Sequence, residues 1–203
     1  MKPLYLAADG AMSGEVPTNE KGATSFNSDP LNQMEMPGTA FLGAKDARQF
    51  EKQTDVRTFS TEPLTEPVEW TGRVRAELYV SSTAKDSDFI VRVSDVYPDG
   101  RSILIIEYPW RARYREGLDR EVLLVPGEVH KLAFDVGWMS QIFAKGHRIR
   151  VTVASTGAPL YEPNPQTGEP MTIEFPKNAV KATNTIHHSR NHASRILAPV
   201  AAE

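Results

Sequence analysis

Apolar side chains recur at every second position along much of this chain, and this period is the pattern of β-strands. Residues 73–81 show it most clearly, with apolar side chains at Val74, Ala76, Leu78 and Val80. Because successive side chains of a strand point to opposite faces, these four are predicted to face the core of a half-buried strand. The same alternation is found at residues 89–93, 132–136 and 149–153. The pattern predicts an antiparallel all-β domain, either a sandwich or a jelly roll.

The neighbouring segments refine this prediction. In the strand at residues 89–93, Arg92 is expected to face out, as is Ser94 just beyond it. Residues 102–108 are nearly continuously apolar, which favours a strand covered on both faces. Between these two strands, Pro98-Asp99-Gly100 predicts a tight turn, because Pro fixes φ and both Asp and Gly accept left-handed backbone. The last strand candidates are residues 171–175 and 195–200.

The first sixty residues differ from the rest, because they mix turn formers with isolated apolar residues and show no sustained period. We expect residues 1–60 to form an extended segment packed on the sandwich, which residues 61–203 would build. Together the two parts are expected to make one structural domain. One short helix is expected around residues 45–51.

Composition limits the classes of function. The chain has 203 residues, a formal net charge of −3 and 24% charged residues, as is usual for a soluble globular protein. The near-neutral charge argues against a nucleic-acid partner. No apolar run approaches the roughly 20 residues of a membrane span, and no signal peptide is visible before Asp9. The absence of cysteine excludes disulfides, thiolate catalysis and Cys-ligated zinc, and leaves the localisation undefined.

No catalytic motif is found. The nucleophile elbow of α/β-hydrolases needs G-x-S-x-G, and residues 10–14 carry Ser13 at the wrong spacing. His188 and His192 have the i, i+4 spacing of a zinc-binding helix, but the residues between them supply no carboxylate base and include Arg190. We therefore interpret His187, His188 and His192 as hydrogen-bonding side chains of a loop. No catalytic residue, metal site or cofactor is predicted.

Residues 110–116 are the most basic stretch. On a strand, Arg111, Arg113 and Arg115 would share one face and could contact phosphate or bases. The favoured interpretation is an outer sheet face on which these arginines pair with carboxylates, because the chain is acidic overall. The carboxylates considered are Glu107, Glu116, Asp119 and Glu121.

Two ligand classes are weaker hypotheses. Four aspartates lie close in sequence, but they lack the EF-hand spacing, so no calcium site is predicted; they are Asp86, Asp88, Asp95 and Asp99. Exposed aromatic rings could stack on sugars, and the candidates are Trp70, Trp110, Trp138 and Tyr161. A stand-alone carbohydrate-binding or protein-interaction module therefore remains the alternative function.

Several segments occur in an order typical of a single protein family. They are residues 60–72, Asp86-Ser87-Asp88-Phe89, residues 94–101, residues 111–116, residues 143–151, Asn164-Pro165-Gln166-Thr167-Gly168 and residues 192–197. Together they resemble the C-terminal domain of the CocE/NonD-type serine hydrolases, the family of cocaine esterase, X-Pro dipeptidyl-peptidase and α-amino-acid ester hydrolase enzymes. The resemblance extends over nearly the whole chain.

This resemblance implies a galactose-binding-like jelly-roll β-sandwich that packs on an α/β-hydrolase catalytic domain, either fused upstream or present as a separate chain. It implies that this chain is noncatalytic and that the parent protein is a serine hydrolase, an acyl esterase or an X-Pro dipeptidyl-peptidase. By the same resemblance, residues 38–42 correspond to a loop that approaches the substrate pocket in some members. Phe41 and Leu42 would then be apolar residues of the pocket wall.

Overall fold

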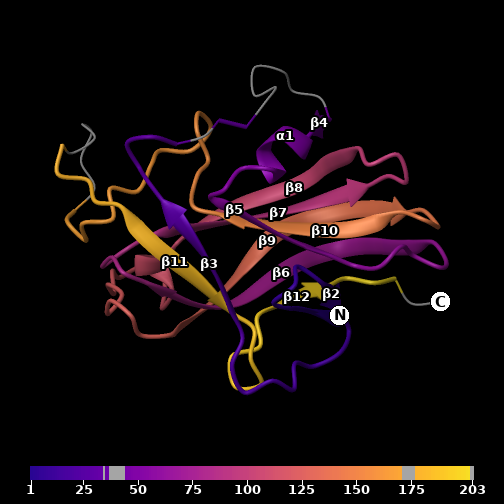
Figure 1. The fold of residues 1–203 in the computed structure, drawn as a ribbon, viewed down its shortest axis with the longest axis horizontal. Coiled ribbons are helices and arrows are strands. Elements are labelled where there is room, and N and C mark those ends of the chain that lie inside the picture. Colours follow the sequence, from indigo (N-terminus) through magenta and orange to yellow (C-terminus); the bar gives the residue numbers. More distant parts are fainter. Residues whose placement is uncertain (34, 37–43, 171–176, 202–203) are drawn as a thin grey trace.

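Two antiparallel β-sheets lie face to face in the computed structural model of the protein (Figure 1). The structure describes residues 1–33, 35–36, 44–170 and 177–201. The larger sheet has the strand order β2-β1-β12-β6-β11-β3, and β9 also pairs with β6. Its strands are β1 (Lys2–Leu6), β2 (Met12–Ser13), β3 (Ala23–Ser28), β6 (Val68–Ser82), β9 (His130–Phe143), β11 (Ala182–His187) and β12 (Arg195–Ala198).

The smaller sheet has the order β4-β8-β7-β10-β5. Its strands are β4 (Lys45–Asp46), β5 (Val56–Ser60), β7 (Asp88–Val96), β8 (Ser102–Arg111) and β10 (Arg148–Ala154). Two short helical segments complete the described elements: the α-helix α1 (Arg48–Glu51) and the 3-10 helix η1 (Ala112–Tyr114). The all-β sandwich predicted from the sequence is confirmed, whereas the finer jelly-roll assignment stays a prediction.

The core lies between the sheets and is built by the alternating strands. Val74, Ala76, Leu78 and Val80 of β6 are fully buried, as the sequence predicts. They pack in one cluster with apolar residues of β7, β9 and β10. Since burying one such side chain contributes about 1.5–3 kcal/mol, this alternation determines which face of β6 points inward.

Two predictions about strand burial were wrong. Every residue of β7 is buried, including Arg92 and Ser94, which were expected to face out. The residues of β8 are mostly half-buried, although their apolar run favoured a strand covered on both faces. For Arg92 the physical reason is that Phe50 of α1 lies over the outer side of β7, with the guanidinium 4.4 Å from its ring. The cover comes from a distant segment, so the strand's own sequence does not reveal it.

The first sixty residues contribute strands to both sheets. β1 pairs with β12 and β3 pairs with β11 in the larger sheet, while β5 pairs with β10 in the smaller one. The helix expected at residues 45–51 is shorter than predicted, because residues 45–46 form β4 and only Arg48–Glu51 are α-helical. The division of the chain at residue 60 stays a prediction.

The predicted C-terminal strands have different outcomes. β12 covers Arg195–Ala198 within the predicted 195–200, whereas the candidate at 171–175 lies outside the described residues.

The turn at Pro98-Asp99-Gly100 is confirmed, with Gly100 at φ 89° and the Tyr97 N–H donating to the Arg101 carbonyl. No helix in the described part of the chain is long and apolar enough to cross a membrane.

The β6–β9 pair contains a β-bulge. Its register shifts between Val74 and Arg75, opposite Gly137 of β9, whose φ of 137° few other residues adopt. A Cβ atom at Gly137 would lie 2.7 Å from Cδ1 of Ile106 in the opposing sheet. Glycine is therefore favoured here for its backbone conformation, and an added Cβ atom would also force the end of the Ile106 side chain to shift.

Candidate functional site

The two residues predicted to line a substrate pocket, Phe41 and Leu42, lie outside the described residues. Their described neighbours show where that segment joins the fold. Met36 is buried and packs with Phe50 of α1, and Ala44 directly precedes β4. Both ends of the segment are therefore anchored close to α1 (Figure 1).

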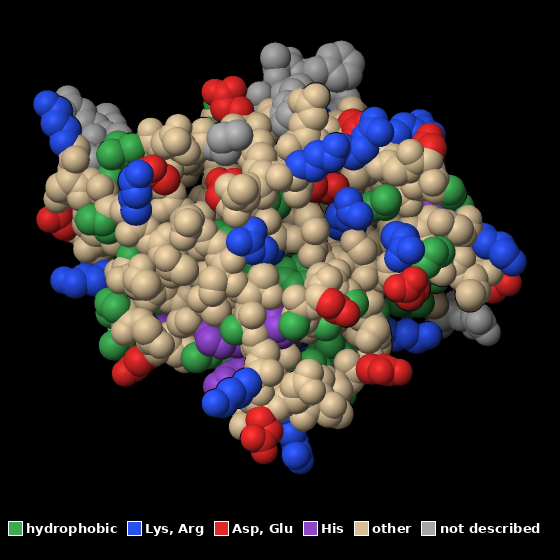
Figure 2. All heavy atoms as spheres, viewed as in Figure 1, with side chains coloured by type: hydrophobic (Ala, Val, Ile, Leu, Met, Phe, Trp, Pro, Cys, Tyr) green, Lys and Arg blue, Asp and Glu red, His purple; other side chains and the backbone are tan. Residues whose placement is uncertain are grey.

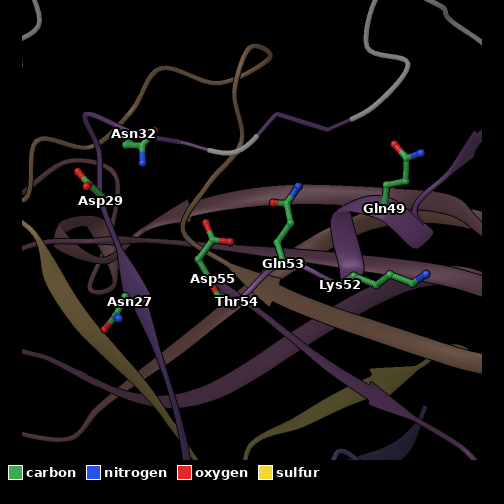
Figure 3. A pocket seen from close by; sticks show the side chains of 8 residues that line it. All are labelled: Asn27, Asp29, Asn32, Gln49, Lys52, Gln53, Thr54 and Asp55. Carbon is green, nitrogen blue, oxygen red and sulfur yellow. The ribbon is translucent and has the colours of Figure 1, made fainter.

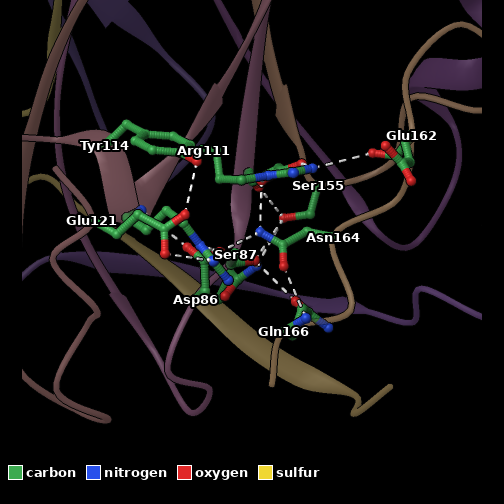
Figure 4. A network of polar contacts seen from close by, with 12 residues as sticks. Asp86, Ser87, Arg111, Tyr114, Glu121, Ser155, Glu162, Asn164 and Gln166 are labelled. Carbon is green, nitrogen blue, oxygen red and sulfur yellow. Dashed lines mark hydrogen bonds and ion pairs between the residues drawn. The ribbon is translucent and has the colours of Figure 1, made fainter. Parts of the chain in front are cut away.

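The basic stretch at residues 110–116 belongs to a buried polar network rather than to an outer sheet face (Figure 4). Arg113 has no exposed side-chain surface, nor does its partner Asp86. The Arg113 Nε donates to Asp86 Oδ2 at 2.7 Å, and one of its Nη atoms donates to the Glu169 carbonyl at 2.9 Å. The other Nη pairs with Glu121 at 3.1 Å. All the guanidinium nitrogens of this buried cation thus have partners, as buried charges require.

Arg111 forms the second buried pair of this network. It contacts Asp88 through two parallel hydrogen bonds of 2.9 Å, the fork geometry that arginine makes with carboxylates. The Asn164 amide donates to Asp86 Oδ2 at 2.8 Å and to Asp88 Oδ1 at 2.7 Å, so one side chain joins the two carboxylates. The prediction that these arginines pair with carboxylates is confirmed for Glu121, and for Glu116, which Arg115 approaches at 3.9 Å.

The predicted strand row was wrong, because β8 ends at Arg111 and the chain then turns into η1. This turn directs Arg113 into the interior, toward Asp86, which precedes β7. The sequence reasoning missed Asp86 and Asp88 as the main partners. Their i, i+2 spacing, matched to that of Arg111 and Arg113, was the available signal.

The network extends to two further parts of the chain. The Ser87 hydroxyl donates to Gln166 Oε1 at 2.9 Å, and the Asn184 amide of β11 donates to Ser87 Oγ at 2.6 Å and Ser155 Oγ at 2.8 Å. Gln166 has φ 66°, which is unusual for a residue other than glycine, and its own amide donates to the Val180 carbonyl. The segments that carry the family resemblance at residues 86–89 and 164–168 therefore connect the sheets and loops to each other.

The histidines do not form a catalytic site. The His187 Nε2 lies 2.9 Å from Ser81 Oγ, and the His188 Nε2 lies 2.8 Å from Thr24 Oγ1. No carboxylate contacts either imidazole among the described residues, and burial lowers the pKa of both His187 and His188. Figure 2 shows histidine side chains gathered on one part of the surface. Hydrogen bonding is confirmed for the side chains of His187 and His188, but His187 is the last residue of β11 rather than part of a loop. The His192 ring lies against the ring of Tyr79.

Another histidine has a carboxylate partner but no serine. The His147 Nδ1 lies 2.8 Å from Asp95, and its ring lies against that of Tyr97, at the start of β10. In the described part of the chain, this is the only His–carboxylate contact within hydrogen-bonding distance. A Ser–His–carboxylate arrangement, which nucleophilic catalysis by serine needs, is therefore not present among these residues.

The four aspartates considered as calcium ligands do not come together around a common site. Asp86 and Asp88 pair with arginines, Asp95 with His147, and Asp99 with Arg101. No group of three or more potential metal-ligating side chains occurs in the described ranges.

The four aromatic residues considered as sugar platforms differ in exposure. Trp70 is buried in the core, and one face of Trp110 is stacked on Phe134. Trp138 is 73% exposed, with the Arg73 guanidinium 5.4 Å from its ring. Since Trp70 is 1% exposed, it cannot present a ring to a ligand.

A polar pocket of about 480 Å³ lies beside α1 (Figure 3). Gln53 and Asp55, which follow α1, project into it side by side. The Gln53 Oε1 and the Asp55 Oδ1 are both buried without a hydrogen-bond donor among the described residues. Burial raises the pKa of Asp55, whereas the hydrogen bond from Lys181 lowers the pKa of Asp29. The lining residues are Asn27, Asp29, Asn32, Gln49, Lys52, Gln53, Thr54 and Asp55.

Comparison with known proteins identifies the family. Residues 2–197 match the family described as the X-Pro dipeptidyl-peptidase C-terminal non-catalytic domain. The chain belongs to this family. It is thus a non-catalytic C-terminal domain of the CocE/NonD-type hydrolases, as the ordered segments predicted. Three of those segments, residues 86–89, 111–116 and 164–168, meet in the buried polar network.

Relatives and solved structures agree with this assignment. The chain is 37% identical to the cocaine esterase of Rhodococcus sp. (strain MB1 Bresler), over 98% of this chain and 37% of the esterase. A structure of an α-amino acid ester hydrolase superposes with a TM-score of 0.93 at 32% identity, covering 98% of this chain and 36% of that one. An aminopeptidase from a marine sediment archaeon, Thaumarchaeota archaeon, superposes with a TM-score of 0.91 at 29% identity, with the same two coverages. The chain therefore spans about a third of the length of these proteins.

Proposed function

We propose that the chain serves a serine hydrolase of the acyl esterase or X-Pro dipeptidyl-peptidase class by packing on its α/β-hydrolase catalytic domain. That domain is either fused upstream or a separate chain. The observation that carries the proposal is the match of residues 2–197 to a non-catalytic C-terminal domain family. It is supported by the buried ionic groups, because Arg111, Arg113 and their carboxylate partners are occupied with one another. Because these groups are bonded to one another, they are not free for catalysis.

We propose further that Phe41 and Leu42 form part of the wall of the substrate pocket in the assembled hydrolase. The support is the family resemblance of residues 38–42 and the anchoring of both ends of this segment beside α1. Apolar side chains that line a pocket contribute binding energy by removing substrate surface from water.

Steady-state hydrolysis of an aryl ester by the assembled hydrolase tests both parts. Phe41→Ala and Leu42→Ala are expected to raise KM about 5- to 30-fold, because each truncation removes roughly 1–2 kcal/mol of apolar contact. The matched control is Leu31→Ala, which truncates an apolar side chain that is 62% exposed. Unchanged kinetics in both pocket variants would contradict the wall assignment. If the chain does not associate with a catalytic domain, the packing role itself is wrong.

A further inference from the structure

Strand β9 forms an edge of the larger sheet. It pairs with β6 along one side, and with no other strand in the described part of the chain. Its other side, called here the free edge, therefore presents backbone N–H and C=O groups that can extend the sheet. The Ile142 carbonyl accepts a hydrogen bond of 3.2 Å from the adjacent Gln141 side chain, and a strand partner would replace this local contact.

The hydrogen bonds of β6 show which residues of β9 direct their backbone groups to the free edge. The Thr71 N–H donates to the Pro199 carbonyl at 3.0 Å, on the side of β6 away from β9. Its cross-strand partner Ser140 therefore directs its own N–H and C=O groups away from β6, as in every antiparallel pair without mutual bonds. Since this direction alternates along a strand, Trp138 and Ile142 do the same.

The side chains of these three residues share the outer face of the larger sheet. The Ser140 Oγ lies 3.0 Å from the Thr71 Oγ1 on that face, and its neighbours Trp138 and Ile142 are 73% and 60% exposed. Residues 136–143 contain neither a charged residue nor a proline. Natural sheets use such residues to keep exposed edges from pairing, so this free edge lacks the usual protection against association.

The free edge is complementary to itself. A two-fold axis at Ser140 brings two copies of this residue opposite each other, and it brings Trp138 of each copy opposite Ile142 of the other. In this register all three residues exchange their N–H and C=O bonds across the junction. Pairs of an aromatic and a β-branched side chain stabilise antiparallel strands, and no like charges meet. These features favour a second copy as the occupant.

The free edge and the side that carries α1 belong to different layers of the sandwich. Phe50 of α1 lies over the outer side of β7 in the smaller sheet, whereas Trp138 lies on the outer face of the larger one. A catalytic domain packed beside α1 would therefore leave the outer face of the larger sheet open. The argument for a second copy does not depend on the proposed function.

We propose that the free edge of β9 binds a second copy of this chain. Residues 138–142 of the two copies pair in antiparallel register about Ser140, and the two larger sheets become one continuous sheet. Trp138 and Ile142 supply the apolar contacts on its outer face.

Sedimentation equilibrium of the 203-residue chain tests this association. We expect the mass of two chains at concentrations up to about 100 µM. Ser140→Lys places two lysines opposite each other and should raise the dissociation constant at least about tenfold. Ser13→Lys is the control, because it makes the same change at an exposed position of β2, on the other side of the larger sheet. A monomeric wild-type chain, or equal effects of the two variants, would overturn the proposal.

A mixture of two variants tests the two-fold axis. Ser140→Lys and Ser140→Glu are each expected to be monomeric alone, and to associate when mixed, because opposite charges then face each other. Thermal unfolding of each variant shows that both remain folded. A mixture that stays monomeric would overturn the register, and a monomeric chain that uses Trp138 only to bind the catalytic domain would overturn the choice of occupant.

A cross-link gives an independent measure of the register. The chain has no cysteine, so Ser140→Cys introduces a single thiol. Opposite residues of a mutually bonded pair have Cα atoms about 5.5 Å apart, which lies within the range that a disulfide spans. Mild oxidation should convert this variant to a disulfide-linked dimer, whereas Ser13→Cys should stay largely monomeric. Equal cross-linking of the two variants would contradict pairing at Ser140.

Discussion

Individual charged residues of this sandwich are buried to an extent that only complete pairing makes tolerable. Arg113 and Asp86 have no exposed side-chain surface, and each guanidinium nitrogen of Arg113 has an acceptor. Desolvation of such ions costs several kcal/mol each, and attraction between them offsets this cost only when the remaining donors and acceptors are also bonded. The stability of the fold is therefore sensitive to the loss of one member of a pair.

Removal of one charge from the buried network is expected to destabilise the protein strongly. Arg113→Ala leaves Asp86 buried beside Asn164 without its counter-ion, and should lower the free energy of unfolding by about 3–5 kcal/mol. Urea denaturation followed by tryptophan fluorescence measures this change. Arg120→Ala is the matched control, because it breaks an exposed pair with Glu116 and should cost less than about 1 kcal/mol. Equal effects of the two variants would contradict this account of the network.

The histidine cluster predicts how stability depends on pH. Burial lowers the pKa of His187 and His188 below the ordinary value of 6.5, so the unfolded chain binds protons more readily than the folded one. Their contribution to stability is complete above pH 6.5 and is lost as the pH falls below that value toward the folded-state pKa. Thermal unfolding between pH 5 and 7.5 should show this loss.

The double variant His187→Gln/His188→Gln should flatten that slope, because glutamine keeps a hydrogen-bonding group but does not titrate. A double variant with the wild-type slope would show that other groups cause the dependence.

At the level of elements, the sequence predicts a strand well when only one of its faces is buried and no distant segment covers the other face. β6 alternates because one side meets the core, and Val74 to Val80 were assigned correctly for this reason. β7 was assigned wrongly because Phe50 covers its outer side, and Phe50 lies some forty positions earlier in the chain. Burial imposed by tertiary contacts leaves no period in the strand's own sequence.

The polar network and the pocket beside α1 could likewise be predicted only in part from the sequence. The sequence indicates that the arginines of residues 110–116 pair with carboxylates, but it does not reveal that η1 turns Arg113 toward Asp86. The pocket beside α1 could not be predicted either, since its walls come from β3, α1 and the segment after each. Asn27 and Asp55 are far apart in the sequence, and only the fold brings both to the wall of the same pocket.

The β-bulge between β6 and β9 leads to a prediction at this scale. Gly137→Ala forces an unfavourable φ of 137° and places a Cβ atom 2.7 Å from Ile106 Cδ1, so it should destabilise the protein by about 1–3 kcal/mol. Gly14→Ala is the control, because its Cβ would meet no atom closer than 4.0 Å, and it should cost less than about 0.5 kcal/mol.

A double variant with Ile106→Val separates the two causes of this effect. Valine lacks the clashing Cδ1, so it should relieve part of the cost of Gly137→Ala but not the backbone strain. Denaturation of both single variants and the double variant measures the coupling. A Gly137→Ala variant as stable as the wild type would contradict the preference for glycine at the bulge.

As a whole, the molecule is a β-sandwich whose charged and polar side chains connect its own parts. The network from Asp86 to Asn184 joins the start of β7, η1, the loop at 155–166 and β11. The chain spans about a third of the length of its relatives and matches a family described as non-catalytic. These observations agree with an accessory domain that acts through the surfaces it presents.

The central claim is that this polypeptide has no serine nucleophile of its own, and labelling with a fluorophosphonate measures this most directly. Such reagents react with a serine only when a neighbouring base activates it. Intact-mass spectrometry of the 203-residue chain after exposure to the reagent is expected to show the unmodified mass, whereas the assembled hydrolase should take up one label, on the catalytic domain. Stoichiometric labelling of a serine in this chain, abolished by prior unfolding, would contradict the account.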